Sequence, residues 1–217
     1  MQETTSRSDL GTPRERRKRE TVERIERNAV ALALRSGSAA VTIEEICDLS
    51  NISVRTFYNY CDSKDAAIIG ASPVLPSAEA LDRFRAGMSE DILIDLLETV
   101  GESFASLDSP DPLSRDRARL LRAEPALLEA MGHQMVKVRK ELADIVAERL
   151  RRCDPEGRTD RILVEAEMIV ELKTAVMRTA LFAWARSSSR TFDETRHDAL
   201  AAAHRTIAPG MIARRAD

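Results

Sequence analysis

The segment from Thr42 to Cys61, TIEEICDLSNISVRTFYNYC, constrains the fold of this chain most, because it carries two helix-start signals separated by one short turn. Thr42 and Glu45 have the spacing of a capping box, in which each side chain bonds to the backbone N–H of the other residue. Ser53 is a favourable N-cap for a second helix. The segment therefore predicts two short helices joined by a tight turn.

An apolar repeat at spacings of three and four precedes this segment and predicts a longer helix over residues 16–35. Ile25, Ala29 and Leu32 fall on one face of that helix, and Gly37 follows it as a typical helix end. Three helices with facing apolar sides are enough to form a small core.

Residues 53–61 divide into two faces when they are placed on a helix, which turns about 100° per residue. Phe57 and Cys61 point to one side and are expected to join the small core, whereas Arg55 and Asn59 point the opposite way. Arginine and asparagine can form paired hydrogen bonds with guanine and adenine edges in the major groove. This predicts a helix-turn-helix that binds DNA; an ordinary polar surface on three amphipathic helices is the alternative.

Neighbouring polar residues suit the DNA backbone. Tyrosine hydroxyls and the Lys64 ammonium can donate to phosphate oxygens. Thr42 and Ser53 mark helix N-termini, whose free N–H groups and positive dipole ends attract anions. The chain has a net charge of −3, but Arg14–Arg19 is a compact basic run. Such a run is usually a solvated helix start, and an anion-binding arm is the alternative.

Composition extends the helical prediction to all 217 residues, since Ala, Leu, Arg and Glu are abundant and no segment alternates like a strand. We expect an all-α protein. The SPVLPS stretch at 72–77 breaks the pattern, so a domain boundary is placed there, although a continuous structure with a kinked connection is equally compatible. The expected parts are a disordered tail over 1–13, a helix-turn-helix domain over 14–70 and a ligand-binding and dimerisation domain over 71–217.

Beyond the boundary, the pattern predicts further helices over residues 78–87, 89–106, 125–152, 160–186 and 193–207, and one that starts at Pro112. Thr191 and Glu194 form a capping box before the last of them.

The segment 160–186 is unusual because 17 of its 27 residues are apolar, too many for one face. A helix that is apolar on two sides is buried on two sides. We expect one side to pack on its own domain and the other on a second copy, with the last helix completing a four-helix interface. The central helix of a monomeric bundle is the alternative. The expected interface residues are Ile169, Val176, Leu181, Trp184, Leu200 and Ile207.

Several classes of function lack support in the sequence. Cys47, Cys61 and Cys153 have no metal-ligand or redox spacing and are expected to be small buried residues in a reducing cytosol. No catalytic or phosphate-loop constellation appears, so no enzyme activity, cofactor or metal is expected. No secretory signal and no apolar stretch of membrane-spanning length is present. We therefore expect a cytoplasmic protein with no membrane partner.

From about Arg16 to Gly70, the chain resembles the DNA-binding domain of the TetR family of bacterial transcriptional regulators. The matching motifs are Thr42-Ile-Glu-Glu-Ile46, Asn51-Ile-Ser-Val-Arg-Thr-Phe-Tyr-Asn-Tyr60 and Asp62-Ser-Lys-Asp65. The resemblance implies a homodimer whose two recognition helices fit successive major grooves of a palindromic operator in double-stranded DNA.

The resemblance also implies a role for each matching residue. Residues at or beside the bases would be Val54, Arg55, Thr56, Tyr58 and Asn59. Residues that hold phosphates would be Thr42, Ser53, Tyr60 and Lys64. The basic run, with Arg16, Arg17 and Lys18, would serve as an N-terminal arm along the backbone or minor groove.

Two positions depart from the family pattern. Asn51 stands at a turn position that is often glycine, and asparagine tolerates the left-handed conformation. Cys61 stands where the family often has phenylalanine, which leaves a smaller side chain between the third and fourth helices. A redox role for this thiol is an open alternative, without a partner cysteine at close spacing.

The C-terminal region, with RARLLRAEPALLEAMGHQM at Arg117–Met135, is similar to the mycofactocin-regulator-like branch of the family, which is associated with acyl-CoA-like ligands. Apolar faces, methionines and isolated polar residues suggest a pocket, although methionines at helical spacing are core filling more often than ligand lining. The candidate ligand residues are Phe84, Met88, Phe104, Leu121, Met131, Met135, Glu171, Thr174 and Arg178.

The expected function is therefore that of a homodimeric, ligand-responsive repressor that a small apolar or acyl-type effector releases from its operator. The fourth helix, from Lys64 into the second domain, is the expected lever. The alternatives are a ligand-independent activator or architectural DNA-binding protein and, outside DNA binding, an all-α carrier or enzyme.

Overall fold

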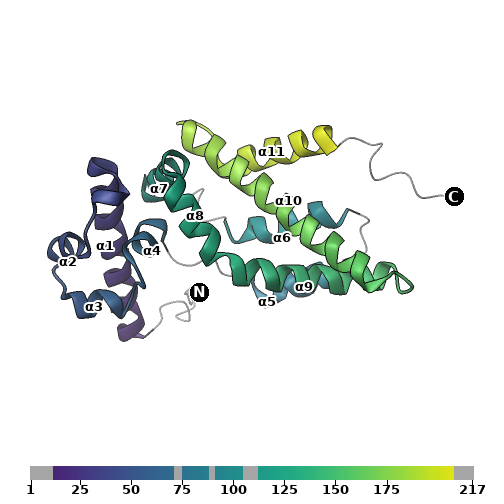
Figure 1. Cartoon of the computed structure of the whole chain (residues 1–217), viewed down its shortest axis with the longest axis horizontal. Helices are drawn as coiled ribbons and strands as arrows, with labels where there is room; N and C mark the ends of the chain where they lie inside the picture. The colour runs from purple at the N-terminus through teal and green to yellow at the C-terminus, as the bar shows by residue number, and fades with distance from the viewer. Residues whose placement is uncertain (1–11, 71–74, 88–90, 105–111, 208–217) are drawn as a thin grey trace, which may run out of the picture. The chain divides into compact units, whose positions relative to one another are not determined.

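The computed structural model describes residues 12–70, 75–87, 91–104 and 112–207, and every regular element in these ranges is a helix (Figure 1). This confirms the all-α prediction. The chain forms two compact units. Unit 1 comprises Met1–Ser72 and Ala123–Met131, and unit 2 comprises Pro73–Arg122 and Gly132–Asp217. Unit 1 thus includes a segment, Ala123–Met131, that the sequence pattern places in the second domain.

Unit 1 is built from one long and several short helices with local caps. Thr42 and Glu45 form the predicted capping box at the start of α2, and the Ser53 and Ser63 hydroxyls accept the first free N–H groups of α3 and α4. Each cap satisfies a backbone donor that lacks a partner inside its helix. The elements are α1 (Pro13–Ser36), the 3₁₀ turn η1 (Ser38–Ala40), α2 (Ile43–Ser50), α3 (Val54–Tyr58), α4 (Lys64–Ile69) and the first part of α8 (Pro125–Gln134).

Two helix boundaries in unit 1 differ from the expected ones. Helix α1 begins at Pro13, because Thr12 and Glu15 form a further capping box and proline is favourable in a first turn. The basic run therefore lies in the first turns of a helix. Helix α3 ends at Tyr58, three residues before the predicted end at Cys61.

The turn between α2 and α3 has the predicted form. Asn51 ends α2 in the left-handed conformation, with φ 51° and ψ 53°. Asparagine adopts this conformation at lower cost than most residues. The turn therefore needs no glycine.

The helices of unit 1 bury apolar side chains of their own. Phe57 of α3 is fully buried, together with Ile25 of α1 and Ile46 of α2. Leu127 of α8 is also buried. The opposing side chains of α3 stay outside, which confirms the two-faced helix expected from the sequence.

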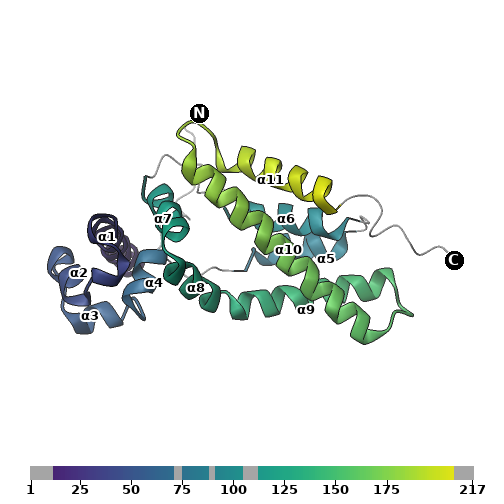
Figure 2. The ribbon, with the colours of Figure 1, turned by 45° about the horizontal axis from the view of Figure 1, so that its top comes forward.

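Unit 2 is built around α10, which packs beside α9 and α11 and also contacts α6 (Figure 2). The helix expected over 125–152 is two helices, α8 and α9, which separate at Met135. Gly132, a poor helix former, precedes this break by one turn. The elements of unit 2 are α5 (Ala78–Ala86), α6 (Ile92–Glu102), α7 (Pro112–Ala123), α9 (Val136–Cys153), α10 (Thr159–Arg186) and α11 (Phe192–Ile207).

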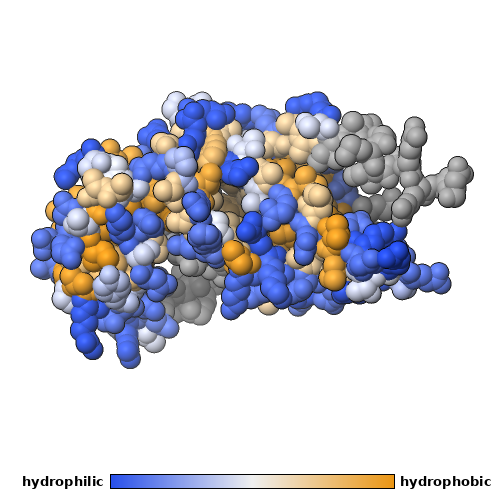
Figure 3. Space-filling model, in the orientation of Figure 1, coloured by the Kyte–Doolittle hydropathy of each residue, from blue (hydrophilic) through white to orange (hydrophobic). Residues whose placement is uncertain are grey.

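Helix α10 is apolar on two sides, as the sequence predicts, but the side that faces the core of unit 2 differs from the expected one. Val176 and Trp184, which were expected at a dimer interface, are buried within unit 2. The large apolar residues left exposed on α10 are Leu163, Val164 and Met168, and Figure 3 shows hydrophobic side chains on this surface. Ile169, Leu181 and Leu200 are partly buried, and the side chain of Ile207 lies outside the described residues.

A buried arginine joins three helices of unit 2. Arg149 of α9 is 1% exposed and forms an ion pair with Asp95 of α6. It also donates a 3.1 Å hydrogen bond to the Phe84 carbonyl oxygen of α5, and its guanidinium lies 4.7 Å from the centre of the Phe84 ring. These contacts compensate the cost of removing the charge from water.

No helix in the described ranges is both long enough and apolar enough to cross a membrane.

Candidate nucleic-acid interface

Helix α3 presents a compact polar surface. The Ser53 hydroxyl accepts a 3.0 Å hydrogen bond from the Thr56 N–H and lies 2.8 Å from the Thr56 hydroxyl. Phe57 points into the core, and its ring meets the Tyr58 ring edge-on at 5.6 Å. Tyr58 itself is 54% exposed. The buried phenylalanine therefore fixes the helix while its neighbours face solvent.

Arg55 and Asn59 are exposed, and neither side chain bonds to any other residue in the described part of the chain. Their donors and acceptors are thus available to a partner. Val54 is exposed beside them, and Thr56 and Tyr60 are partly exposed. An exposed arginine on α3 and an exposed asparagine at its C-cap are suited to base edges in the major groove.

The two helix starts are present, but their hydroxyl groups are occupied by local bonds. The Thr42 hydroxyl donates to a Glu45 carboxylate oxygen at 2.9 Å and accepts the Glu45 N–H at 3.2 Å. Hydrogen bonds from the Thr42 backbone and hydroxyl lower the pKa of Glu45. Anions can therefore approach Thr42 through backbone N–H groups rather than through its hydroxyl hydrogen.

Lys64 has a different environment from the phosphate contact that the resemblance implies. Its ammonium donates to the backbone carbonyl oxygens of Ser38, Ala39 and Val41 at 3.0, 3.1 and 2.9 Å. An ammonium has three hydrogens, so all its donors are used. In this structure Lys64 of α4 stabilises η1.

Replacing Lys64 by methionine is expected to lower the stability of unit 1 by about 2 kcal/mol, because it removes charge-assisted bonds to three carbonyl groups. Lys140→Met is the control, since Lys140 is exposed and its one ion pair within the described residues is with Asp144. Thermal unfolding followed by circular dichroism measures the difference. A Lys64→Met protein of unchanged stability, with a salt dependence of DNA binding reduced by about one charge, would instead support the phosphate role.

Glu124, at the start of α8, holds the same 3₁₀ turn from another side. Its carboxylate accepts the Ser38 N–H at 3.1 and 3.3 Å and also the Ser38 hydroxyl. This contact lies within unit 1 and joins the start of α8 to η1. The sequence gives no sign of this contact, because the two residues are 86 positions apart.

The basic run is exposed on the first turns of α1. Arg16 makes a 3.8 Å ion pair with Glu20, which is too exposed to fix the arginine strongly. Arg17 and Lys18 are exposed beside it.

The Cys61 thiol is buried, and burial, with smaller effects from Glu26 and Asp62, raises its pKa to about 11. Burial also raises the pKa of Cys47, whereas Cys153 is exposed, contrary to the expectation that all three are buried. The thiolate is the reactive form of cysteine. This environment argues against the redox alternative for Cys61.

Ellman's reagent at pH 8 is therefore expected to modify one thiol promptly and the other two only after unfolding. At that pH roughly one Cys61 in a thousand is a thiolate. Cys153→Ser should remove the rapid phase. Prompt modification of a second thiol in the folded protein would contradict this assignment.

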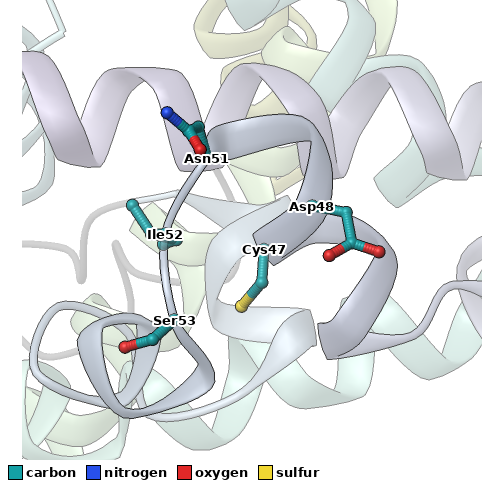
Figure 4. Close-up of a pocket in the computed structure, with 5 residues that line it drawn as sticks. All are labelled: Cys47, Asp48, Asn51, Ile52 and Ser53. Carbon is teal, nitrogen blue, oxygen red and sulfur yellow. The ribbon is translucent and has the colours of Figure 1, made fainter.

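A hollow of about 360 Å³ lies at the helix-turn-helix turn and is lined by Cys47, Asp48, Asn51, Ile52 and Ser53 (Figure 4). Its lining is mainly polar and its residues belong to the turn between α2 and α3. The hollow is therefore part of the turn and not the apolar pocket expected for an effector.

The candidate ligand residues do not gather at one described site. Phe84 and Leu121 are buried in unit 2, Phe104 and Met135 are partly buried there, and Met131 belongs to unit 1. Met88 lies outside the described residues.

The three polar candidates on α10 have local partners or face solvent. Glu171 is exposed and forms an ion pair with Arg139 at 3.0 Å. Thr174 donates to the Val170 carbonyl oxygen, and Arg178 is exposed.

Sequence reasoning missed Lys173, which is buried on α10. The sequence feature that could have indicated its burial is its spacing. Lys173 lies three residues after Val170 and four before Met177, on the side of α10 that faces the core. The described ranges contain no cluster of three metal-ligating side chains.

A helix-turn-helix unit joined to a larger helical unit is typical of transcriptional regulators. Residues 93–211, more than half of the chain, match the family model described as the MftR C-terminal domain of TetR-type regulators. The chain belongs to the TetR family of transcriptional regulators.

Two solved structures are similar in outline. Thermus thermophilus FadR, a TetR family transcriptional repressor in complex with lauroyl-CoA, is 25% identical with a TM-score of 0.47, over 90% of this chain and 97% of that chain. A putative TetR-family regulator from Mesorhizobium loti MAFF303099 is 15% identical with a TM-score of 0.39, over 88% and 96%. Comparison with curated proteins gives no match.

Proposed function

We propose that the protein is a homodimeric repressor that binds a palindromic operator through α3 and leaves it when an effector binds unit 2. The observation that supports this most is the pair of free polar side chains, Arg55 and Asn59, on a helix fixed by Phe57. In the proposal these residues contact bases, together with Val54, Thr56 and Tyr58. Tyr60, Ser53, the start of α2 at Thr42, and the basic run of α1 contact phosphates.

Dimerisation is proposed through α10 and α11. Support comes from the exposed side of α10, where Val164 and Met168 are large and apolar and Ala175 is small. These residues follow helical spacing on the side of α10 opposite Lys173 and Met177. Apolar surface of this kind on a soluble helix is typical of a partner interface.

The proposed effector is a small apolar or acyl-type molecule that binds in unit 2. Its binding shifts the population of conformations away from the one that fits the operator. Helix α4 ends at Ile69, and Gly70, its C-cap, has a φ of 95°. We therefore assign the coupling to α8 as well, because Glu124 bonds to η1 while the same helix continues into unit 2 at Gly132.

Selection of bound genomic fragments by the purified full-length protein tests the proposal. A single enriched palindromic motif, with two protein chains bound per site, is the expected result. Enrichment without a palindrome, or binding by a monomer, would contradict the dimeric repressor. The genes beside the motif then supply candidate effectors, and a bound effector that leaves operator affinity unchanged would favour the ligand-independent alternative.

A further inference from the structure

Two charged side chains on the outer side of α10 have no partner among the described residues. Glu167 and Arg178 are both exposed, and neither forms an ion pair or a hydrogen bond there. They are eleven residues apart, which is about three helical turns, so they lie on the same side of α10 to within about 20°. Glu171, between them, is already paired with Arg139 at 3.0 Å. The outer side of α10 thus has a free anion toward its start and a free cation toward its end.

Exposed apolar side chains gather around the acidic end. Val164 and Met168, one turn apart on α10, are 64% and 57% exposed. A hollow of about 330 Å³ opens between α9 and the same part of α10, and its lining includes Val136, Ala143 and Leu163. Val136 and Leu163 are themselves 53% and 42% exposed. Four of the eight large apolar side chains exposed in the described ranges therefore lie on this part of unit 2, which indicates a surface that a partner covers.

The arrangement of charges indicates that the partner is a second copy of the chain. Such a partner must present a cation opposite Glu167, an anion opposite Arg178 and apolar side chains nearby, and α10 itself does so when its direction is reversed. A two-fold axis perpendicular to α10 reverses the direction of the second helix. If the axis lies halfway between the two charged residues, each glutamate faces the arginine of the other copy. Glu167 and Glu171 would instead repel an anionic partner such as a nucleic acid.

We propose that α10 packs antiparallel against α10 of a second copy, and that Glu167 of each copy forms an ion pair with Arg178 of the other. The inference rests on the proposed homodimer and specifies how its two chains align. The same axis puts Phe182, which is partly exposed, opposite Leu163 at the edge of the α9–α10 hollow. Helix α9 thereby takes part in the interface. Like charges brought opposite each other disfavour a pairing, so these two positions also select which chains can pair.

Charge reversal in the purified full-length protein tests this alignment without DNA. Sedimentation equilibrium gives the dimer dissociation constants of wild type, Glu167→Arg and Arg178→Glu. Each single substitution puts two pairs of like charges into the interface, so dimerisation should weaken by at least about ten-fold. Glu165→Arg is the matched control, because Glu165 is exposed and lies about 160° around α10 from Glu167. Circular dichroism verifies that each variant is folded.

A mixture of the Glu167→Arg and Arg178→Glu proteins provides a second measurement, with a fluorescent label on one of them. In a pair of unlike chains, opposite charges face each other at both positions. Heterodimers should therefore form with wild-type affinity to within about three-fold, although each variant dimerises poorly alone. The double variant should form homodimers for the same reason. A general loss of folding in either variant could not produce this rescue.

Dimerisation that neither reversal weakens, or a mixture without heterodimers, overturns the proposal. If a reversal variant does not fold, Glu167→Gln and Arg178→Gln replace the pair, because they remove the attraction without adding repulsion. They should weaken dimerisation by about three-fold, and unchanged dissociation constants would again overturn the proposal. A dimeric wild type that none of these substitutions affects contradicts only this alignment. A wild type that is monomeric, also on its operator, contradicts the proposed homodimer as well.

Discussion

Arg149→Ala is expected to lower the free energy of unfolding of unit 2 by about 3–5 kcal/mol. The substitution leaves the Asp95 carboxylate without its ion-pair partner and the Phe84 carbonyl oxygen without a donor. It also removes the guanidinium from the Phe84 ring and opens a cavity among α5, α6 and α9. Together these losses should lower the melting temperature of unit 2 by roughly 6–20 °C.

Fluorescence can follow this transition specifically, because Trp184 is the one tryptophan in the sequence and lies buried in unit 2. Urea titration of wild type and variant gives the change in free energy. Arg152→Ala is the control on the same helix, since in the described part of the chain Arg152 makes a single, exposed ion pair, with Glu148. That variant should lose less than about 1 kcal/mol.

Equal effects of the two arginine substitutions would show that the buried contacts of Arg149 contribute nothing beyond those of a surface pair.

Gly87 supplies a second measurement of the same packing. A Cβ at residue 87 would lie 3.0 Å from the Arg149 guanidinium. Gly87→Ala should therefore destabilise unit 2 through the same contacts.

Arg55→Ala is expected to weaken operator binding by about 2–6 kcal/mol, or roughly 30-fold to 10⁴-fold. Each specific arginine contact with a base contributes about 1–3 kcal/mol, and the substitution occurs twice in the proposed dimer. The variant should remain folded, because the Arg55 side chain is exposed and bonds to no other residue in the described part of the chain. Asn59→Ala should act at a different base pair by a similar amount.

The measurement is a titration of the selected operator and of a scrambled duplex at several salt concentrations. Arg55→Ala should lose affinity mainly for the operator and relax specificity at one position of each half-site. Lys18→Ala, in the basic run, should weaken both duplexes alike and reduce the salt slope. If Arg55→Ala weakens both duplexes equally, Arg55 contacts the backbone and not a base.

Local features of the DNA-binding unit could be predicted from the sequence because their interactions span only a few residues. The Thr42–Glu45 box joins positions three apart, and Asn51 adopts the left-handed conformation that its side chain tolerates. The inward position of Phe57 follows from helical spacing once a core partner exists. The Thr12 capping box is equally local, so the same reasoning could have predicted it.

The features that could not be predicted depend on contacts between residues far apart in the chain. Lys64 and Glu124 both bind η1 from 25 or more positions away, and no local sequence pattern predicts these contacts. The rotation of α10 was also undetermined, because a helix that is apolar on two sides gives no periodic signal for which side is inner.

The sequence alone thus determined an all-helical chain, the helix-turn-helix and the side of α3 that carries Arg55 and Asn59, since caps and periodicity are local physical effects. Only the tertiary structure decided that Lys64 stabilises the fold, that α8 begins within the DNA-binding unit and that Lys173 is buried on α10. Burial and the pairing of charges depend on packing, and packing depends on contacts between segments that are far apart in the sequence.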